Sequence, residues 1–237
     1  MQIDTPLKGL RVAVTGGTSG LGLALVEQLA ARGARVAFVA RTGSAVGRTA
    51  RRTGAHGIVG DVGAKDDIYP MALQITGALG GLDVLVNNAS SLGPTPLALL
   101  ADTQCEELAE ALQVNVIGPF RLTKALFGAL AASAREGRGA VVLNVSSDAA
   151  VNAYPGWGAY GASKAALAHL SDIWNEEAAG EGVRFLSLDP GDMDTPLHAL
   201  AAPDDDPATL RRPQDSAAEL IEAIVAALPQ RAERAVA

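Results

Sequence analysis

The sequence predicts an α/β domain in which helices cover both faces of a parallel sheet. Short apolar runs alternate along the chain with longer segments of helical periodicity, which is typical of strands connected through helices. Several runs, such as residues 12–14 and 36–39, are apolar at every position, as expected of strands buried on both faces. Because 237 residues suit one domain, we expect residues 1–237 to form a single domain.

The predicted elements follow one another in a regular order. Strands are expected at residues 10–15, 35–40, 56–60, 82–87, 140–145 and 183–188. Helices are expected at residues 20–31, 44–52, 64–79, 103–135, 157–179 and 213–228. The long irregular segments that remain, 90–102 and 192–212, follow strand ends on the carboxyl edge of the sheet, where ligands of open α/β sheets bind. We expect both to face a substrate, with residues 192–212 as a lid and its Asp204, Asp205 and Asp206 as a solvated turn.

Composition excludes several classes of protein. The chain is 49% hydrophobic and carries a formal charge of −7, which argues against disorder and against a nucleic-acid or anionic-membrane partner. Cys105, the single cysteine, predicts no intrachain disulfide, and the first residues resemble no signal peptide. No apolar run approaches the ~20 residues that cross a bilayer, and no spacing of ligand residues suggests a metal site. We therefore expect a cytoplasmic protein with a small-molecule partner.

A glycine-rich turn follows the first predicted strand. Gly16, Gly20 and Gly22 lie between residues 10–15 and an apolar-periodic helix. Glycines allow a backbone to approach a pyrophosphate, which then meets the positive end of the helix. The spacing differs from the common G-x-G-x-x-G, so this turn by itself also fits an ordinary strand-to-helix connection.

The end of the second predicted strand bears on the choice of dinucleotide. An acidic residue at this place would bind the ribose 2′-hydroxyl of NAD, but the chain has Ala40 and Arg41. A guanidinium suits a 2′-phosphate, so the sequence favours NADP(H) over NAD(H). The alternative is that Arg41 is simply a solvent-facing residue.

Tyr160 and Lys164 are spaced so that they share a face of one predicted helix, where an ammonium group stabilises an ionised phenol. Such a pair carries little weight alone. It is, however, accompanied by further motifs in a fixed order: residues 15–22, Asp61-Val62, residues 87–90, Ser147 thirteen positions before Tyr160, and residues 190–195. With these motifs the chain resembles the short-chain dehydrogenase/reductase family over nearly its whole length, which implies a Rossmann-type doubly wound parallel sheet.

The resemblance implies a catalytic role for Asn115, Ser147, Tyr160 and Lys164. Tyr160 would be the general acid, and Ser147 would hydrogen-bond the same substrate oxygen. Lys164 and the positive charge of the nicotinamide would lower the pKa of Tyr160, and Lys164 would also hold the nicotinamide ribose. Asn115 would anchor a water in a proton relay, or would simply precede a helix break at Gly118-Pro119. The resemblance also implies a set of cofactor-binding residues: Gly16, Thr18, Ser19, Gly20, Leu21, Arg41, Asp61, Val62, Asn88, Ala89, Tyr160, Lys164, Pro190, Gly191 and Thr195.

The substrate-facing residues are expected on the irregular segments and just before Tyr160. They form a mainly apolar mouth, made of Ser90, Leu92, Pro94, Tyr154, Trp157, Met193, Leu197 and His198. Trp157 also fits core packing, and His198 also fits a solvent-facing position. This mouth favours a ketone on a hydrophobic skeleton over a phosphorylated sugar.

The sequence therefore predicts an NADPH-dependent oxidoreductase that reversibly reduces a carbonyl of a hydrophobic small molecule to a secondary alcohol. The alternatives are a dinucleotide-binding sensor without turnover, and a dehydratase or epimerase on the same scaffold. The chain departs from the family pattern at Ser90, where glycine is usual, and in residues 228–237, where the usual last strand is short, altered or absent. We expect a homodimer or homotetramer formed through the long helices at residues 103–135 and 157–179.

Overall fold

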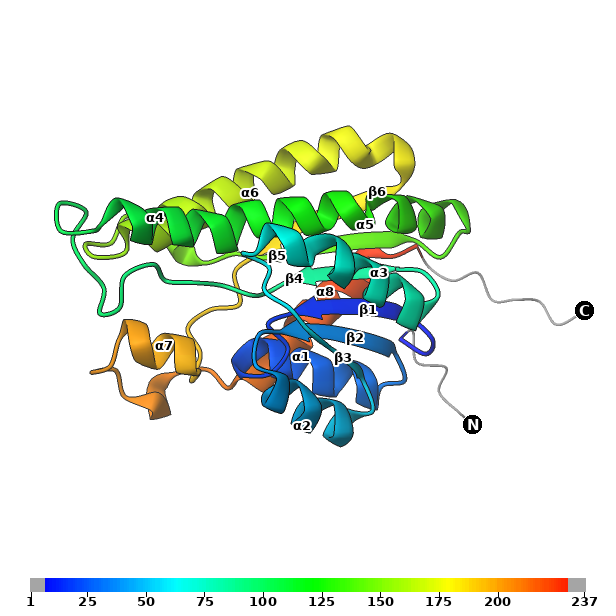
Figure 1. The fold of residues 1–237 in the computed structure, drawn as a ribbon, viewed down its shortest axis with the longest axis horizontal. Helices are drawn as coiled ribbons and strands as arrows, with labels where there is room; N and C mark the ends of the chain where they lie inside the picture. Colours follow the sequence, from blue (N-terminus) through cyan, green and yellow to red (C-terminus); the bar gives the residue numbers. More distant parts are fainter. Residues whose placement is uncertain (1–6, 230–237) are drawn as a thin grey trace, which may run out of the picture.

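The predicted parallel sheet is confirmed by the computed structural model, which describes residues 7–229. Six strands lie in the order β3-β2-β1-β4-β5-β6, and every neighbouring pair is parallel. They are β1 (Arg11–Thr15), β2 (Arg35–Ala40), β3 (His56–Val59), β4 (Val84–Asn87), β5 (Ala140–Val145) and β6 (Val183–Leu188). The chain starts in the middle of the sheet and winds outward in both directions (Figure 1), so the carboxyl ends of β1 and β4 flank the point where the winding reverses.

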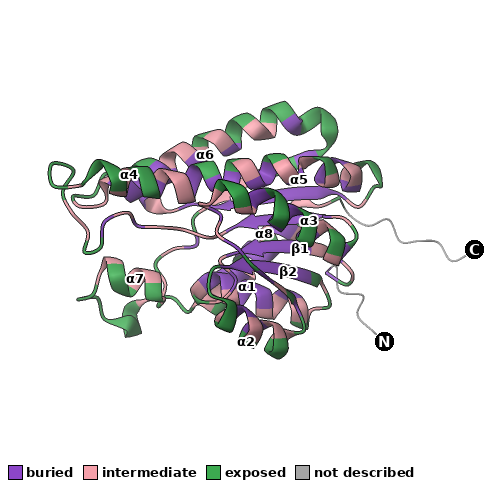
Figure 2. Ribbon diagram, viewed as in Figure 1, coloured by how far each residue is buried: buried purple, intermediate pink, exposed green. Residues whose placement is uncertain are grey.

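Helices cover both faces of the sheet, and each face has its own apolar core. One face carries α1 (Gly20–Ala31), α2 (Gly43–Thr53) and α8 (Pro213–Ala227), which pack on Val14, Phe38 and their neighbours. The other carries α3 (Ile68–Leu79), α5 (Gly118–Arg135) and α6 (Gly158–Ala178), which pack on Leu85, Val142 and their neighbours. Figure 2 shows the strands buried between these layers, in agreement with their uninterrupted apolar sequences.

The long helix predicted at residues 103–135 is divided in the structure. It consists of α4 (Cys105–Leu112), a π-helical turn at Gln113–Ile117 and α5. The wider π turn places Asn115 inside the protein, where its side chain bonds to neighbouring segments. Such π turns arise inside α-helices, often at functional sites, and periodicity alone does not reveal them.

The lid is more ordered than the sequence predicts. Residues 192–212 contain α7 (Pro196–Ala201) and a 3₁₀ turn at Pro207–Thr209. Thr195 caps α7, since its side-chain oxygen accepts a hydrogen bond from the His198 amide at 3.2 Å, and Pro196 suits the first helical position. A cap followed by proline was therefore the signal for a helix here.

The other boundaries agree with the prediction to within a few residues. The predicted helix at residues 64–79 starts as a 3₁₀ turn (Lys65–Asp67) before α3. The expectation of a shortened or missing last strand concerns residues 228–237, of which 230–237 lie outside the described residues. Within residues 7–229, no helix is long and apolar enough to cross a membrane.

Candidate active site

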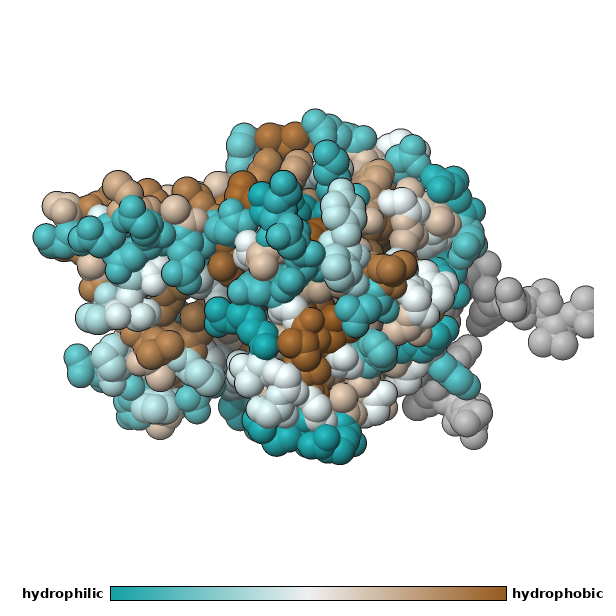
Figure 3. Space-filling model, in the orientation of Figure 1, coloured by the Kyte–Doolittle hydropathy of each residue, from teal (hydrophilic) through white to brown (hydrophobic). Residues whose placement is uncertain are grey.

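A cleft of about 960 Å³ lies at the carboxyl edge of the sheet. Its walls come from the turns after β1, β2, β4, β5 and β6, from the start of α6, and from the lid that carries α7. Figure 3 shows hydrophobic side chains on the left of the view, between α4 and the lid. The cleft extends from the glycine turn at one end to Tyr160 at the other.

The glycine turn packs so closely that side chains would not fit in it. Gly16 has a φ of 72°, and a Cβ on Gly22 would lie 2.2 Å from the Gly16 carbonyl oxygen. Asn88 holds the turn from β4, because its Nδ2 donates to the Thr15 carbonyl oxygen at 2.8 Å. The backbone itself thus forms one wall of the cleft, as close approach to a ligand requires.

The start of α1 is suited to an anion. No side chain caps this helix and its first turn holds no acidic residue, so the free amides and the positive helix end face the cleft. Thr18, Ser19, Gly20 and Leu21 all line the cleft there. These features fit the diphosphate of a dinucleotide.

The end of β2 provides a second polar pocket. Arg41 is exposed and lines the cleft beside Ala40, and the adjoining helix α2 has neither a side-chain cap nor an acidic first turn. Asp61 and Val62 line the next part of the cleft, where the Asp61 carboxylate already accepts the Gly63 amide at 2.8 Å. A phosphorylated adenosine would therefore meet one free guanidinium here, and a carboxylate that is already bonded.

Tyr160, Lys164 and Ser147 come together at the other end of the cleft. Tyr160 lies in the first turn of α6 and Lys164 one turn later, with Nζ 5.5 Å from the centre of the Tyr160 ring. Lys164 donates to the Val145 carbonyl oxygen at 2.8 Å. Ser147 follows β5, and its Oγ donates to Asp148 Oδ1 at 3.1 Å. The lysine is thus anchored to the same strand that presents the serine.

Burial dominates the ionisation of this group. It raises the pKa of Tyr160 to about 12, and contacts with Ser147 and Ser90 offset this only in part. Burial also lowers the pKa of Lys164 to about 8. The expected lowering of the Tyr160 pKa by Lys164 is therefore not seen in the free protein, because removal of both groups from water disfavours their charged forms.

Asn115 supports the site from behind. It is 1% exposed and does not line the cleft. Its amide group donates to the Ser91 carbonyl oxygen at 2.7 Å and to Ser163 Oγ at 2.8 Å, while its oxygen accepts the Ser91 amide at 2.8 Å. Because Ser163 in turn donates to the Tyr160 carbonyl oxygen at 2.6 Å, Asn115 ties the loop after β4 to the catalytic turn of α6.

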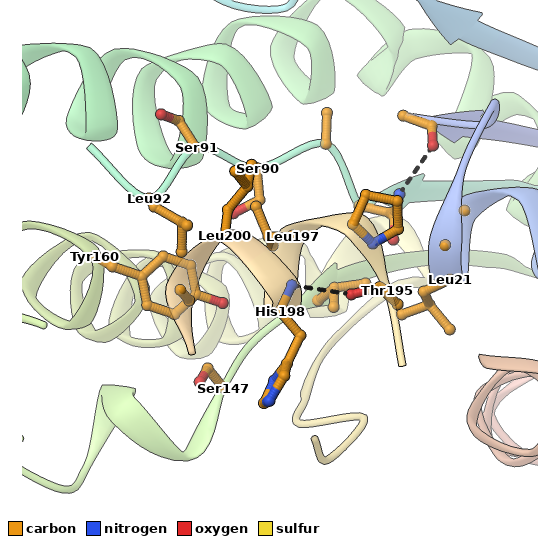
Figure 4. Close-up of a pocket in the computed structure, with 18 of the residues that line it drawn as sticks. Leu21, Ser90, Ser91, Leu92, Ser147, Tyr160, Thr195, Leu197, His198 and Leu200 are labelled. Carbon is orange, nitrogen blue, oxygen red and sulfur yellow. Dashed lines mark hydrogen bonds between the residues drawn. The ribbon is translucent and has the colours of Figure 1, made fainter. Parts of the chain in front are cut away.

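The lid covers the end of the cleft that holds Tyr160. Leu197 and Ala201 of α7 pack against a small cluster formed by Leu92, Ala149 and Tyr160. In Figure 4 the Tyr160 hydroxyl points toward the side chains of α7, with Leu92 on one side of its ring and Ser147 on the other. Apolar side chains of the lid thus cover this end of the cleft beside Tyr160.

The structure brings nearly all of the predicted site residues to this cleft. Those that line it are Gly16, Thr18, Ser19, Gly20, Leu21, Arg41, Asp61, Val62, Asn88, Ala89, Ser90, Leu92, Ser147, Tyr154, Trp157, Tyr160, Lys164, Pro190, Gly191, Met193, Thr195, Leu197 and His198. Asn115 and Pro94 are not among them. Trp157 also packs edge-on against Tyr160, and the His198 side chain is only 12% exposed, so His198 is not a freely solvated residue.

Sequence reasoning missed the acidic residues of the cleft: Glu110, Asp148, Asp189, Asp192 and Asp205. Asp205 lies in an exposed turn, as predicted, and its Oδ2 also lies 2.9 Å from His198 Nε2, a contact that the sequence did not indicate. Asp148 and Asp189 had a signal, since both directly follow the carboxyl edge, where ligands bind. The substrate end is therefore less apolar than predicted.

Comparisons with known proteins agree with this geometry. A sequence profile described as short chain dehydrogenase matches residues 11–206. An uncharacterized oxidoreductase of Mycobacterium bovis is 33% identical over 231 residues, which cover 94% of this chain and 66% of the relative. The chain thus spans slightly less than two thirds of that relative. The 2-(R)-hydroxypropyl-CoM dehydrogenase of Xanthobacter autotrophicus is 34% identical over 195 residues, covering 79% of this chain and 76% of the enzyme.

Solved structures with the same fold contain nicotinamide cofactors. A 3-ketoacyl-(acyl-carrier-protein) reductase from Brucella melitensis in complex with NADH has a TM-score of 0.84 and 28% identity, covering 91% of this chain and 90% of that chain. A short chain dehydrogenase from Burkholderia cenocepacia in complex with NADP has a TM-score of 0.79 and 26% identity, covering 92% and 91%.

Proposed function

The chain belongs to the short-chain dehydrogenase/reductase family, whose oxidoreductases use NAD or NADP, and from this premise we propose that it is an NADPH-dependent carbonyl reductase. Its substrate is a small molecule with an apolar skeleton, and the same site oxidises the corresponding secondary alcohol. The observation that carries the proposal is the group of buried Tyr160 and Lys164 with partly exposed Ser147, at one end of a cleft whose other end fits a dinucleotide.

The residues of the chain would divide the work as follows. The amides at the start of α1 bind the diphosphate, and Arg41 binds the 2′-phosphate. Bound NADPH supplies the hydride. Tyr160 donates its proton to the carbonyl oxygen, Ser147 hydrogen-bonds the same oxygen as negative charge develops, and Lys164 stabilises the ionised phenol. The lid excludes water, which strengthens each of these interactions.

The test is a panel of ketones, quinones and diketones assayed for loss of NADPH absorbance, with the wild type and with Tyr160→Phe. We expect the variant to lose at least ~99% of turnover, because general acid catalysis contributes about 10²–10⁴-fold, while NADPH binding changes little. Tyr69→Phe is the matched control, since Tyr69 is 77% exposed on α3. Wild-type rates in Tyr160→Phe would overturn the catalytic assignment. Tight NADPH binding without reduction of any carbonyl compound would favour a non-catalytic sensor.

Arg41 provides the test of cofactor preference. We expect Arg41→Ala to raise KM for NADPH by about 10–100-fold, because hydrogen bonds to charged groups contribute about 1.5–3 kcal/mol, and to raise KM for NADH far less. Arg48→Ala is the control, since Arg48 is exposed on the adjoining helix and does not line the cleft. Equal effects on both cofactors would show that Arg41 does not select NADPH.

We also propose that the chain forms a homodimer through α4, α5 and α6. Ile117, Phe120 and Ile173 are large apolar residues that remain 37–40% exposed on these helices or the turn between them. Trp174 stacks beneath them on Phe185, with ring centres 5.4 Å apart. The molar mass from light scattering tests this proposal, and a strict monomer contradicts it.

A further inference from the structure

The wall of the cleft beside Tyr160 carries several carboxylates. Asp148 accepts hydrogen bonds from Ser147 Oγ at 3.1 Å and from the Tyr154 hydroxyl at 2.7 Å. Asp189 and Asp192 follow β6 on the adjacent wall, and the charges of Asp148 and Asp189 both act on Tyr160. Negative charges thus lie on two adjacent walls of the cleft beside Tyr160.

Few cations balance these carboxylates. Among the described residues that line the cleft, the Lys and Arg residues are Arg41, at the dinucleotide end, and Lys164, which is 2% exposed behind Tyr160. Arg211 lies nearby, but its guanidinium donates to Pro190 and Glu219. His198 is shared between Asp205, at 2.9 Å, and Asp192, at 4.0 Å. The formal charge at the substrate end is therefore negative.

The same region offers aromatic surface. Tyr154 and Trp157 line the cleft beside Asp148, and Leu92 and Leu197 complete the apolar part. Aromatic faces and carboxylates together bind ammonium groups, through the ring quadrupole and through direct charge attraction. The proposed binding site rests on the cleft and on Tyr160, a residue only 8% exposed whose hydroxyl points toward the side chains of α7, and the carboxylates bear on which substrates it accepts.

We propose that the substrate carries a positively charged ammonium group beside an apolar body, and that Asp148 and Asp192 are its counterions. Carboxylate and phosphate substrates are disfavoured, because they bring like charges together in a partly enclosed site. The negative charge of Asp148 opposes the negative charge that develops on the substrate oxygen during reduction. An ammonium group beside Asp148 would compensate this carboxylate. This inference rests on the proposed carbonyl reductase function and refines its substrate class.

The experiment compares ketones that differ only in charge. Three ketone skeletons are used: acetophenone, cyclohexanone and butanone. Each is prepared with a trimethylammonium-methyl group, with the uncharged tert-butyl-methyl group of the same shape, and with a carboxylate. We expect kcat/KM to be about tenfold higher for the cation than for the neutral analogue on at least one skeleton, about 1.4 kcal/mol, and lowest for the carboxylate. The preference falls as salt is added, because salt screens exposed charges.

Variants of Asp148 and Asp192 test whether these carboxylates cause the preference for the cationic ketone. Asp192→Asn and Asp148→Asn lower the cation-to-neutral ratio of kcat/KM by about threefold or more, and Asn at position 148 keeps an oxygen that accepts from Ser147 or Tyr154. Asp204→Asn is the matched control, since it removes the same charge from the same lid outside the cleft, and it leaves the ratio unchanged.

The outcomes separate this inference from the proposed function. Reduction of neutral ketones with no preference for the cation, or with a preference for the carboxylate, overturns the inference alone. An equal fall in the ratio with Asp204→Asn shows a general field effect and also overturns it. Failure to reduce any ketone, charged or neutral, despite NADPH binding overturns the proposed function and the inference together.

Discussion

Lys164 shows how a single residue is placed at a cost in stability. The residue is 2% exposed, and its ammonium group donates a hydrogen bond to the Val145 carbonyl oxygen. Burial lowers its pKa from 10.5 to about 8, and each pKa unit corresponds to about 1.4 kcal/mol. Holding this residue charged at neutral pH therefore destabilises the folded chain by on the order of 3 kcal/mol.

We expect Lys164→Met to be inactive but more stable at pH 7. Removal of the buried charge outweighs the lost bond to Val145 by roughly 2 kcal/mol, which raises Tm by about 4–8 °C. The cost of the buried charge is full below pH 8 and is lost as pH rises past 10.5, above which the lysine is neutral in both the folded and the unfolded chain. Calorimetry across this pH range measures it. Lys65→Met, at an exposed position, is the control, and a Tm below wild type at pH 7 would contradict the argument.

At the residue scale, the sequence predicted contacts between residues that are close together along the chain, but not contacts between distant segments. Tyr160 and Lys164 lie on one helix, so spacing alone placed them together. The contact of Asp205 with His198 depends on the course of the lid, so the sequence predicted the exposed turn around Asp205 but not this contact. The depth of burial of Tyr160 also comes from contacts with Leu92 and Leu197, which belong to the loop after β4 and to the lid helix, so the direction of its pKa shift could not be predicted.

At the scale of elements, the turn between β1 and α1 can pack closely because glycines there have no side chains. Asn88 braces it from β4, and the backbone of Gly16 occupies the space that a side chain at position 22 would need. This packing explains the unusual glycine spacing, since the positions reflect contact within the turn as well as contact with a ligand.

We expect Gly22→Ala to weaken dinucleotide binding by at least ~10-fold and to lower Tm. An added Cβ would lie 2.2 Å from the Gly16 carbonyl oxygen and 2.4 Å from Asn88 Nδ2, so the turn must shift. Gly77→Ala in α3 is the control, because a Cβ there meets nothing within 4 Å, and this change should stabilise by roughly 0.5–1 kcal/mol. Titration of NADPH fluorescence and thermal denaturation measure both effects. Unchanged binding in Gly22→Ala would show that the turn tolerates a side chain.

The types and order of the elements were readily predicted, because buried parallel strands and amphipathic helices have distinct periodicities. The interruptions were not. The π turn around Asn115 is stabilised by bonds to Ser91 and Ser163, which are distant in the sequence. The lid helix α7 is shorter than two turns of helix, so periodicity could not identify it.

At the scale of the whole molecule, the two edges of the sheet have different roles. The cleft lies at the carboxyl edge, whereas Asp83 is fully buried just before β4, at the amino edge. Arg11, Arg138 and Ser133 all donate to its carboxylate. Burial alone would raise the pKa of Asp83, but these hydrogen bonds lower it to about 2. This group joins β1, β4 and the segments around β5 far from the reacting atoms.

We expect Asp83→Asn to lower stability without changing kcat/KM of the folded protein. Two arginines would lose their buried partner, which costs about 3 kcal/mol and lowers Tm by roughly 6–12 °C. The stability that the carboxylate contributes is present above pH 4 and is lost as pH falls toward 2, so the gap to wild type narrows in acid. Glu181→Gln breaks an exposed ion pair with Arg135 and should cost less than ~1 kcal/mol. An equal loss of stability in both variants would contradict this role of Asp83.

The lid helix touches both halves of the cleft. Its cap residue Thr195 lies against Gly20 at the start of α1, while Leu197 and Ala201 pack around Tyr160. One short segment, α7 with its cap residue Thr195, therefore contacts both ends of the cleft. We therefore expect a bound dinucleotide and a bound substrate to slow each other's release, and the rate of lid opening to set an upper limit on turnover.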